Sequence, residues 1–347
     1  MPAPDTDAAD SPAYLSETWL DLDWSPWVPF DAPREYFYIP KSPGVYRIRA
    51  TGSDPLMYIG ETGQSLHKKL SELRQALRRG DLMPWSDPHA EAPALWAYWV
   101  EWLEARREQQ NATGPSRHAG PEEPEQEDTG ASGQAEDTET EPAESEDDGP
   151  APVMLECSAA ALDASAAGRK GMEAFLLYKY RQERGESPLC NFGRFHPRYR
   201  RSTTRKEGKR GGRLMESHQD NPAGWPGTEP LEAVGTPGDR DWMGLEWTAW
   251  QPLSEDTAKT AAGAGLYLLA GAGSQEIVYI GQAADLRERI AGHAAKPWDD
   301  RPLVFSYQVI GHAVLPHHLR ELEGDLLGNY YEMMKKAPEF RFRMTGR

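Results

Sequence analysis

The chain has little cysteine and no long apolar run. Its 347 residues include only two cysteines, Cys157 and Cys190, too few and too far apart for a disulfide framework or a cysteine-rich zinc site. No stretch offers the ~18 uninterrupted apolar residues of a membrane span, and the acidic start MPAPDTDAADSPAY lacks the pattern of a secretion signal. The sequence therefore predicts reduced thiols, no membrane partner and a cytoplasmic location.

Positive charge is also scarce overall. The formal net charge of −17 by itself argues against nucleic-acid binding, because phosphate contacts need Lys and Arg. The distribution changes this interpretation: residues 121–150 hold 13 Asp and Glu with no Lys, Arg or His, and without them the balance is −4. A basic run follows later, with nine cations against one Glu: Arg194, Arg198, Arg200, Arg201, Arg205, Lys206, Lys209, Arg210 and Arg213.

Large apolar residues are nearly missing from residues 110–150, so this stretch cannot offset the entropy of becoming ordered, and it is predicted to be a disordered insertion. A second break, rich in charge, Gly and Pro, marks a linker. The predicted organisation has four parts: an N-terminal extension at 1–35, a first domain at 36–200, a linker at 201–245 and a second domain at 246–347.

The two predicted domains resemble each other in sequence. The first contains GVYRIRATGSDPLMYIGETGQSLHKKL and the second GLYLLAGAGSQEIVYIGQAADLRERI, with the same twelve-residue step from Tyr46 to Tyr58 and from Tyr267 to Tyr279. Each stretch has the alternation of two strands around a turn and then a helical pattern. A third strand candidate and a helix follow, at 153–159 and from Gly171 in the first copy, and at 303–310 and from Leu319 in the second.

This order predicts the fold class α/β (α+β). Each domain is expected to have the order ββαβα, with a short, mainly antiparallel sheet flanked by helices. The aromatic stretch LWAYWVEWL at 95–103 is interpreted as core rather than as a base-stacking surface, because large apolar residues at such spacing usually face an interior.

The paired motifs Gly-Val-Tyr with Tyr-Ile-Gly, and Gly-Leu-Tyr with Tyr-Ile-Gly, resemble the defining motifs of the GIY-YIG nuclease superfamily. The resemblance covers most of residues 41–200 and 247–340. It implies cleavage of DNA phosphodiesters with Mg²⁺ or Mn²⁺, since hydrolysis needs an activated water and neutralised phosphoryl oxygens. It does not imply a pathway.

In the second copy, the resemblance makes Glu323 the metal ligand at the head of a helix, and Tyr267 the group that helps to activate water. Tyr267 and Tyr279 are expected to place two phenolic oxygens on one surface of the hairpin. Arg289 would add positive charge beside the phosphate, and His293, one helical turn later, a proton donor or a positioning contact.

The first copy departs from this pattern. Tyr46, Tyr58 and Glu173 remain as candidate catalytic residues, with Glu173 as metal ligand, but Lys69 takes the place of the arginine. Leu73 stands where the second copy has His293. Asn191 in N-F-G-R resembles the asparagine that closes the motif set in many relatives, and the second copy shows no obvious counterpart. The second copy is therefore ranked as the likelier catalyst.

The leading hypothesis is a metal-dependent DNA endonuclease in restriction, phage defence or DNA repair, with the basic run gripping the backbone. The tandem copies would form an intramolecular pseudo-dimer that brings two cleavage centres to one duplex. The alternative is a non-catalytic DNA-recognition or regulatory protein built from degenerate modules. A third hypothesis is that the acidic segment 121–150 mimics nucleic acid and covers the basic surface.

Overall fold

The computed structural model describes residues 11–78, 82–113, 154–258, 262–311 and 314–342. Within these ranges the chain forms two similar modules, each with a four-stranded sheet. The first sheet has the strand order β1-β4-β2-β3 and the second the order β7-β10-β8-β9, and every neighbouring pair in both is antiparallel. The predicted α/β (α+β) class with mainly antiparallel sheets is therefore confirmed.

The elements of the first module extend through β6. They are η1 (Ala13–Leu15), η2 (Trp19–Asp21), β1 (Val28–Pro29), η3 (Pro33–Tyr38), β2 (Gly44–Ala50), β3 (Leu56–Thr62), α1 (Leu66–Leu77), α2 (Ala92–Thr113), β4 (Leu155–Ala161), α3 (Ala166–Arg184), β5 (Tyr199–Arg200) and β6 (Gly212–Arg213).

A connecting segment and the second module follow. Their elements are η4 (Pro222–Gly224), η5 (Trp242–Gly244), β7 (Gln251–Pro252), α4 (Glu255–Ala258), β8 (Ala264–Gly271), β9 (Ile277–Ala283), α5 (Leu286–Ala294), η6 (Trp298–Asp300), β10 (Leu303–Gly311) and α6 (Pro316–Met334).

The repeat begins earlier than the paired motifs, at matched tryptophans. The indole of Trp24 donates to the carbonyl of Trp19 over 3.0 Å, and that of Trp247 donates to the carbonyl of Trp242 over 3.0 Å. In each pair the first tryptophan begins a short 3₁₀ helix and the second lies between that helix and the edge strand, β1 or β7. The duplicated unit therefore includes an N-terminal arm that caps its own sheet.

These arms change the expected boundaries. Trp24 and Val28 are buried in the first module, although they lie in the predicted extension 1–35. Trp242 and Met243 are buried in the second module's core, although they lie in the predicted linker 201–245. Helix α2 continues to Thr113, so the first residues of the predicted insertion are helical, and the remainder to residue 150 lies outside the described residues.

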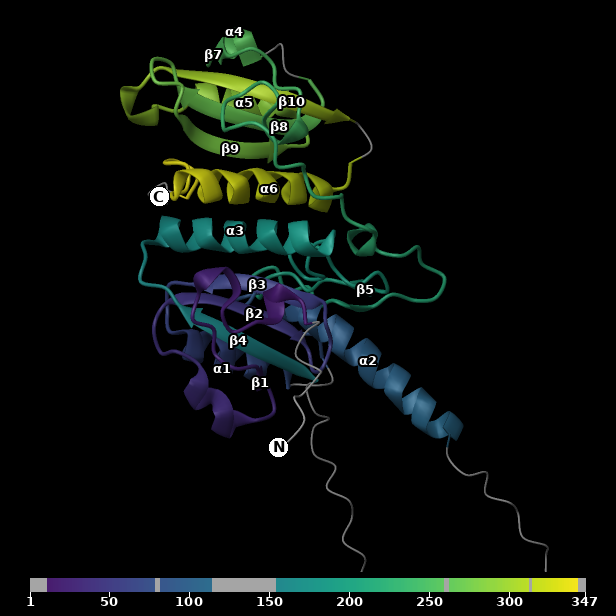
Figure 1. Ribbon diagram of the computed structural model, residues 1–347. Coiled ribbons are helices and arrows are strands. Elements are labelled where there is room, and N and C mark those ends of the chain that lie inside the picture. The colour runs from purple at the N-terminus through teal and green to yellow at the C-terminus, as the bar shows by residue number, and fades with distance from the viewer. Residues whose placement is uncertain (1–10, 79–81, 114–153, 259–261, 312–313, 343–347) are drawn as a thin grey trace, which may run out of the picture.

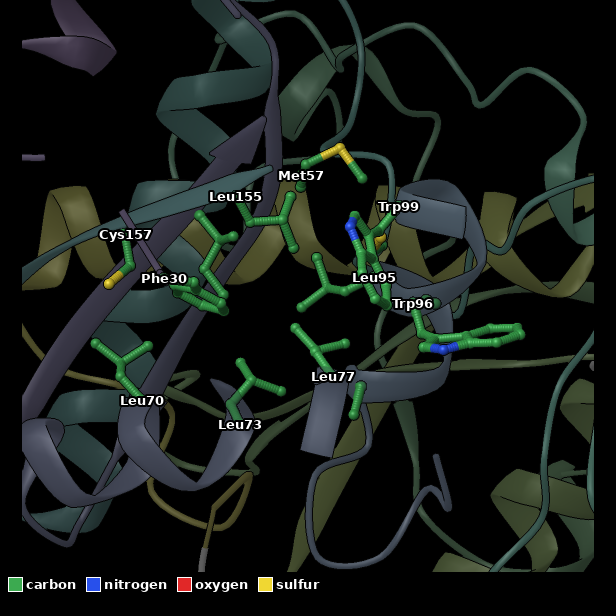
Figure 2. Close-up of a cluster of buried hydrophobic side chains, with 14 of the residues drawn as sticks. Phe30, Met57, Leu70, Leu73, Leu77, Leu95, Trp96, Trp99, Leu155 and Cys157 are labelled. Atoms are coloured by element: carbon green, nitrogen blue, oxygen red, sulfur yellow. The ribbon is translucent and has the colours of Figure 1, made fainter. Parts of the chain in front are cut away.

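The core of the first module lies between its sheet, α1 and α2. Figure 2 shows Leu70, Leu73 and Leu77 of α1 facing Leu95 and the tryptophans of α2. The leucines recur at helical spacing, which gives α1 one apolar face. Leu95, Trp96 and Trp99 are buried, so the interpretation of 95–103 as core is confirmed.

Helices α3 and α6 lie side by side between the two sheets (Figure 1). Gly171 lies against Tyr331, and Arg181 lies against Glu321. In the two helices Gly171 matches Glu321 in position and Arg181 matches Tyr331, so the two contacts are related by symmetry. A Cβ on Gly328 would stand 2.2 Å from Cβ of Tyr178, so only glycine permits this approach. The modules thus pack as a pseudo-dimer across two antiparallel helices.

A buried ion pair fastens this interface. The guanidinium of Arg181 donates from Nε to Oδ1 of Asp325 over 2.8 Å and from Nη2 to Oδ2 over 3.1 Å, and both side chains are fully buried. The backbone N–H of Thr228 donates to Glu321 over 2.7 Å, and that of Leu231 to Asp325 over 3.1 Å. The connecting segment therefore holds the acidic side of the same network.

Candidate active site

The paired motifs place two tyrosines on one face of each hairpin. Tyr267 lies opposite Gly281 on the neighbouring strand, and its ring stacks on Tyr279 with centroids 5.9 Å apart. Tyr46 and Tyr58 have the same centroid distance in the first module. A Cβ on Gly281 would stand 2.5 Å from Cζ of Tyr267, so the motif glycine is needed for the tyrosine ring to cross the neighbouring strand.

In the second module, His293 contacts Tyr267 directly. The hydroxyl of Tyr267 lies 2.7 Å from Nε2 of His293, and the imidazole is buried beside Trp298. Burial, with the charges of Lys296 and Arg289, lowers the His293 pKa to about 3. The imidazole is therefore neutral near pH 7, which favours a positioning contact over a charged proton donor.

The two polar neighbours of His293, Lys296 and Tyr267, determine its tautomer. Nζ of Lys296 lies 3.4 Å from Nδ1, and an ammonium can only donate, so Nδ1 accepts and Nε2 carries the proton. Nε2 then donates to the Tyr267 oxygen. Burial raises the pKa of Tyr267 above its ordinary value, with a further contribution from Tyr279. Tyr267 therefore stays a phenol near neutral pH, which disfavours its expected role as a base.

Arg289 is exposed on α5 and lines an open cavity of about 480 Å³ together with His293 and Lys296. It acts electrostatically on Tyr267, His293 and Glu323, lowering the pKa of each. Arg289 thus places positive charge near Tyr267 and is open to solvent, while its predicted role beside a phosphate stays a prediction.

Glu323 occupies a different environment from the one expected. It is the eighth residue of α6, in the body of the helix rather than at its head. Its Oε1 lies 3.1 Å from Nη2 of Arg341, whose guanidinium also lies 5.6 Å from the ring of Tyr279. Burial raises the Glu323 pKa, while Arg341 and the backbone N–H of Gln282 lower it. The Glu323 carboxylate is therefore already paired with a cation of the protein, Arg341.

The first module contains a carboxylate that the sequence interpretation missed. Oε1 of Glu91 accepts from the hydroxyl of Tyr46 over 2.9 Å and pairs with Nζ of Lys69 over 2.9 Å. Glu91 is buried just before α2, far from either motif in sequence. Leu73 packs in the core, so Tyr46 has this carboxylate as its partner where Tyr267 has a histidine. Glu91 follows no motif, and only its fold position could identify it.

Glu173 lies at the position in α3 that Glu323 has in α6. Burial raises the pKa of Glu173 to about 8, with further contributions from Glu61 and Glu91 and opposition from Lys170 and Lys69. Burial also raises the pKa of Tyr46 and Tyr58. Glu173 thus has two carboxyl neighbours, Glu61 and Glu91, and an added cation would favour its charged form.

Asn191 has a structural role at this site. Its side chain accepts from the backbone N–H of Ile59 over 2.9 Å and donates to the carbonyl of Ile59 over 2.8 Å. These bonds hold strand β3 against the segment after α3. Asn191 does have a positional counterpart: Cys190 N–H bonds to Met57 and Phe340 N–H to Val278, which aligns Asn191 with Arg341.

A cleft between α3 and α6 joins the two modules. It has a volume of about 500 Å³, and both candidate metal ligands, Glu173 and Glu323, line it. Tyr58, Glu91 and Asn191 enter from the first module, and Arg341 from the second. Further cations of this cleft are Lys170, Arg201 and Arg320. One surface therefore combines carboxylates and cations from both copies.

The basic run forms an ordered hairpin, β5–β6, rather than a linker. Arg198 pairs with Glu101 over 2.7 Å, and Arg210 lies over the ring of Trp85 at 4.2 Å. The remaining residues divide into three that contact their own chain, Arg194, Arg201 and Arg213, and four that are exposed without an ion pair to any described residue, Arg200, Arg205, Lys206 and Lys209.

Comparisons of the chain with protein-family models, with curated proteins and with solved structures found no match. Across the described ranges, no helix has both the length and the apolar character needed to cross a bilayer. No three His, Cys, Asp or Glu side chains within those ranges form a metal-binding group. The likeness to GIY-YIG nucleases accordingly remains a prediction from the motifs.

Proposed function

We propose that this chain is a divalent-metal-dependent endonuclease that hydrolyses DNA phosphodiesters in the cleft between α3 and α6. The observation that carries the proposal is the convergence of Glu173, Glu323 and Tyr58 on one cleft lined with arginine and lysine. A phosphodiester needs carboxylate and cationic groups together, since the reaction requires both an activated water and charge neutralisation. Its setting would be restriction, phage defence or DNA repair in the cytoplasm.

The first module fits a divalent cation better than the second. Glu173 and Glu91 line the cleft with carboxylate oxygens, the ligands that Mg²⁺ and Mn²⁺ prefer. Glu173 and Glu91 would hold the ion, with Lys69 fixing Glu91 in place. When bound, the ion supplies Lewis acidity that polarises the phosphate and activates water. Arg341 pairs with Glu323 in the second module, whereas Glu173 has no ion pair to any described residue, which supports reversing the ranking made from sequence.

The tyrosines then act as hydrogen-bond donors. Tyr46 donates to Glu91 and orients it, and the raised pKa keeps both Tyr46 and Tyr58 protonated near neutral pH. Lys170, Arg201 and Arg320 would contact phosphate oxygens in the cleft. The exposed cations of the β5–β6 hairpin would extend this contact along the DNA backbone.

Cleavage of supercoiled plasmid in Mg²⁺ or Mn²⁺ tests the proposal. Glu173→Gln should lower the cleavage rate by roughly 100-fold, because it removes a charge that the reaction needs. Glu332→Gln on α6, whose carboxylate pairs with Lys179 over 2.6 Å, is the matched control and should cut normally. Loss of cutting confined to Glu323→Gln would restore the second module as the catalyst. Nicked circles from one variant would mean that each module cuts one strand.

A non-catalytic DNA-recognition protein is the second candidate. Two ion pairs favour it, Lys69 with Glu91 and Arg341 with Glu323, because each occupies a carboxylate that catalysis would use. A folded protein that binds DNA in a fluorescence anisotropy titration but never nicks plasmid with either metal would establish this reading. The acidic segment 121–150, proposed as a nucleic-acid mimic, lies outside the described residues. Its deletion should raise DNA affinity at low salt.

A further inference from the structure

The second module does not fit the metal ion that its motifs imply. Glu323 is 9% exposed, and its carboxylate accepts from the guanidinium of Arg341 and the backbone N–H of Gln282, with Arg320 and Arg289 as further charged neighbours. The guanidinium and the N–H both donate hydrogen bonds, so they occupy carboxylate lone pairs that an ion would need. Arg341 and a divalent ion would also repel each other in a poorly hydrated site. An ion bound at Glu323 would therefore compete with Arg341 for the same carboxylate.

In the first module the protein's own cation, Lys69, pairs with Glu91 and not with Glu173, which has no ion pair to any described residue. At the position of Arg341 the first module has Asn191, which is neutral and uses its amide on the backbone of Ile59. The backbone bonds of the two segments match, so the difference lies in the side chain rather than in the path of the chain. The duplicated fold therefore has a glutamate at the same helix position in both modules. Glu323 is paired with Arg341, and Glu173 has no arginine at that place.

We propose that Arg341 replaces the metal ion in the second module, which makes that module a metal-independent phosphate-binding half of the cleft while the first module alone holds a divalent ion. The guanidinium contacts Glu323 and lies 5.6 Å from the ring of Tyr279, and it lines the cleft with Arg320. A planar guanidinium so held is suited to a phosphate oxygen pair. The proposal deepens the proposed function, on which its phosphate partner rests.

Manganese binding by the full chain without DNA tests the metal part of this proposal. Isothermal titration should give one equivalent of Mn²⁺ in the wild type, lost in Glu173→Gln and kept in Glu323→Gln. Arg341→Asn, which installs the residue of the first module, should add one equivalent, and Glu323→Gln in the same chain should remove it. Circular dichroism melting confirms that the variants fold. A folded Arg341→Asn protein that gains no equivalent would overturn the proposal.

DNA binding in EDTA tests the phosphate part. Arg341→Asn should weaken binding of a duplex and reduce the slope of log affinity against log salt by about one unit, because one phosphate contact is lost. Lys179→Ala, which removes a cation outside the cleft, should leave the slope unchanged. An unchanged slope in Arg341→Asn would overturn this part. A protein that shows the predicted stoichiometry but cuts no plasmid would refute the nuclease and leave the metal assignment standing.

Discussion

The charge of Glu173 depends on what binds beside it. Its pKa of about 8 arises from burial and from the neighbouring carboxyl groups of Glu61 and Glu91. Near neutral pH the side chain is mostly protonated, and a cation that binds its oxygens must displace the proton. The residue is thus predicted to couple metal binding to pH.

Metal affinity should therefore rise with pH up to about 8. Below that value each fall of one pH unit should weaken Mn²⁺ binding by about tenfold, because a larger fraction of Glu173 must first lose its proton. Above it the affinity should level off. Titrations at pH 6, 7 and 8 measure this dependence, and a constant affinity over that range would contradict it. The number of protons released per Mn²⁺, obtained from buffers of different ionisation enthalpy, gives an independent reading.

His293 should make the fold sensitive to acid. Its folded pKa of about 3 lies below the ordinary value of 6.5, so the unfolded chain takes up the proton first. Stability is then complete above pH 6.5 and falls as the pH drops toward 3. His293→Leu, with the leucine that the first module has as Leu73, removes this loss. The variant also leaves the buried Tyr267 hydroxyl without its hydrogen-bond partner, which should lower the free energy of unfolding by about 1–3 kcal/mol.

Urea unfolding at pH 7.5 and pH 5 separates the two effects. The variant should be less stable than the wild type at pH 7.5, and the gap should narrow by roughly 1–2 kcal/mol at pH 5. His218→Ala, which removes an exposed histidine, is the matched control. A gap that stays the same at both pH values would show that His293 is not the acid-sensitive group.

At the scale of elements, the sequence pattern predicted which strands and helices form better than it predicted where they begin and end. Alternation located the hairpins, but the helix starts were placed at Gly171 and Leu319, whereas α3 begins at Ala166 and α6 at Pro316. Glycine has a low helix propensity, so Gly171 by itself indicates a helix end. It lies inside α3 because the ring of Tyr331 packs against it, a contact between distant parts of the chain.

The site was predictable to the extent that it is local. The tyrosine pairs and His293 lie within one hairpin and helix, and their spacing brings them together. Glu91 and Arg341 reach the site only through the tertiary fold, so neither had a signal in its own stretch of sequence. Asn191 was identified by type, but its role in holding β3 required the structure.

Asn191→Ala should loosen the attachment of β3. The change removes both hydrogen bonds to the backbone of Ile59 and leaves that buried N–H without a partner, at about 1–3 kcal/mol. Hydrogen exchange should accelerate at the Ile59 amide, because strand β3 opens more often. Asn221→Ala, in the connecting segment, is the comparison and should leave Ile59 unaffected. Unchanged protection of Ile59 in Asn191→Ala would contradict the structural role.

At the scale of the whole molecule, two half-sites become one cleft because α3 and α6 pack closely. That packing rests on glycines at the crossing and on the buried pair of Arg181 with Asp325. The pair connects the first module, the second module and the connecting segment at one point. The relative placement of Glu173 and Glu323 therefore depends on residues that lie outside the cleft itself.

Arg181→Met should separate the modules without removing any residue from the cleft. It leaves Asp325 and Glu321 buried without their cation, which should lower the free energy of unfolding by about 3–5 kcal/mol. Lys179→Ala breaks the more exposed pair with Glu332 and should cost less than about 1 kcal/mol. Differential scanning calorimetry should show one transition in the wild type and two in Arg181→Met. Ala174 and Tyr178 of α3 pack in the second module's core, so the helix packing is itself a coupling. A variant that still melts in one transition at the wild-type temperature would mean that this packing couples the modules without the ion pair.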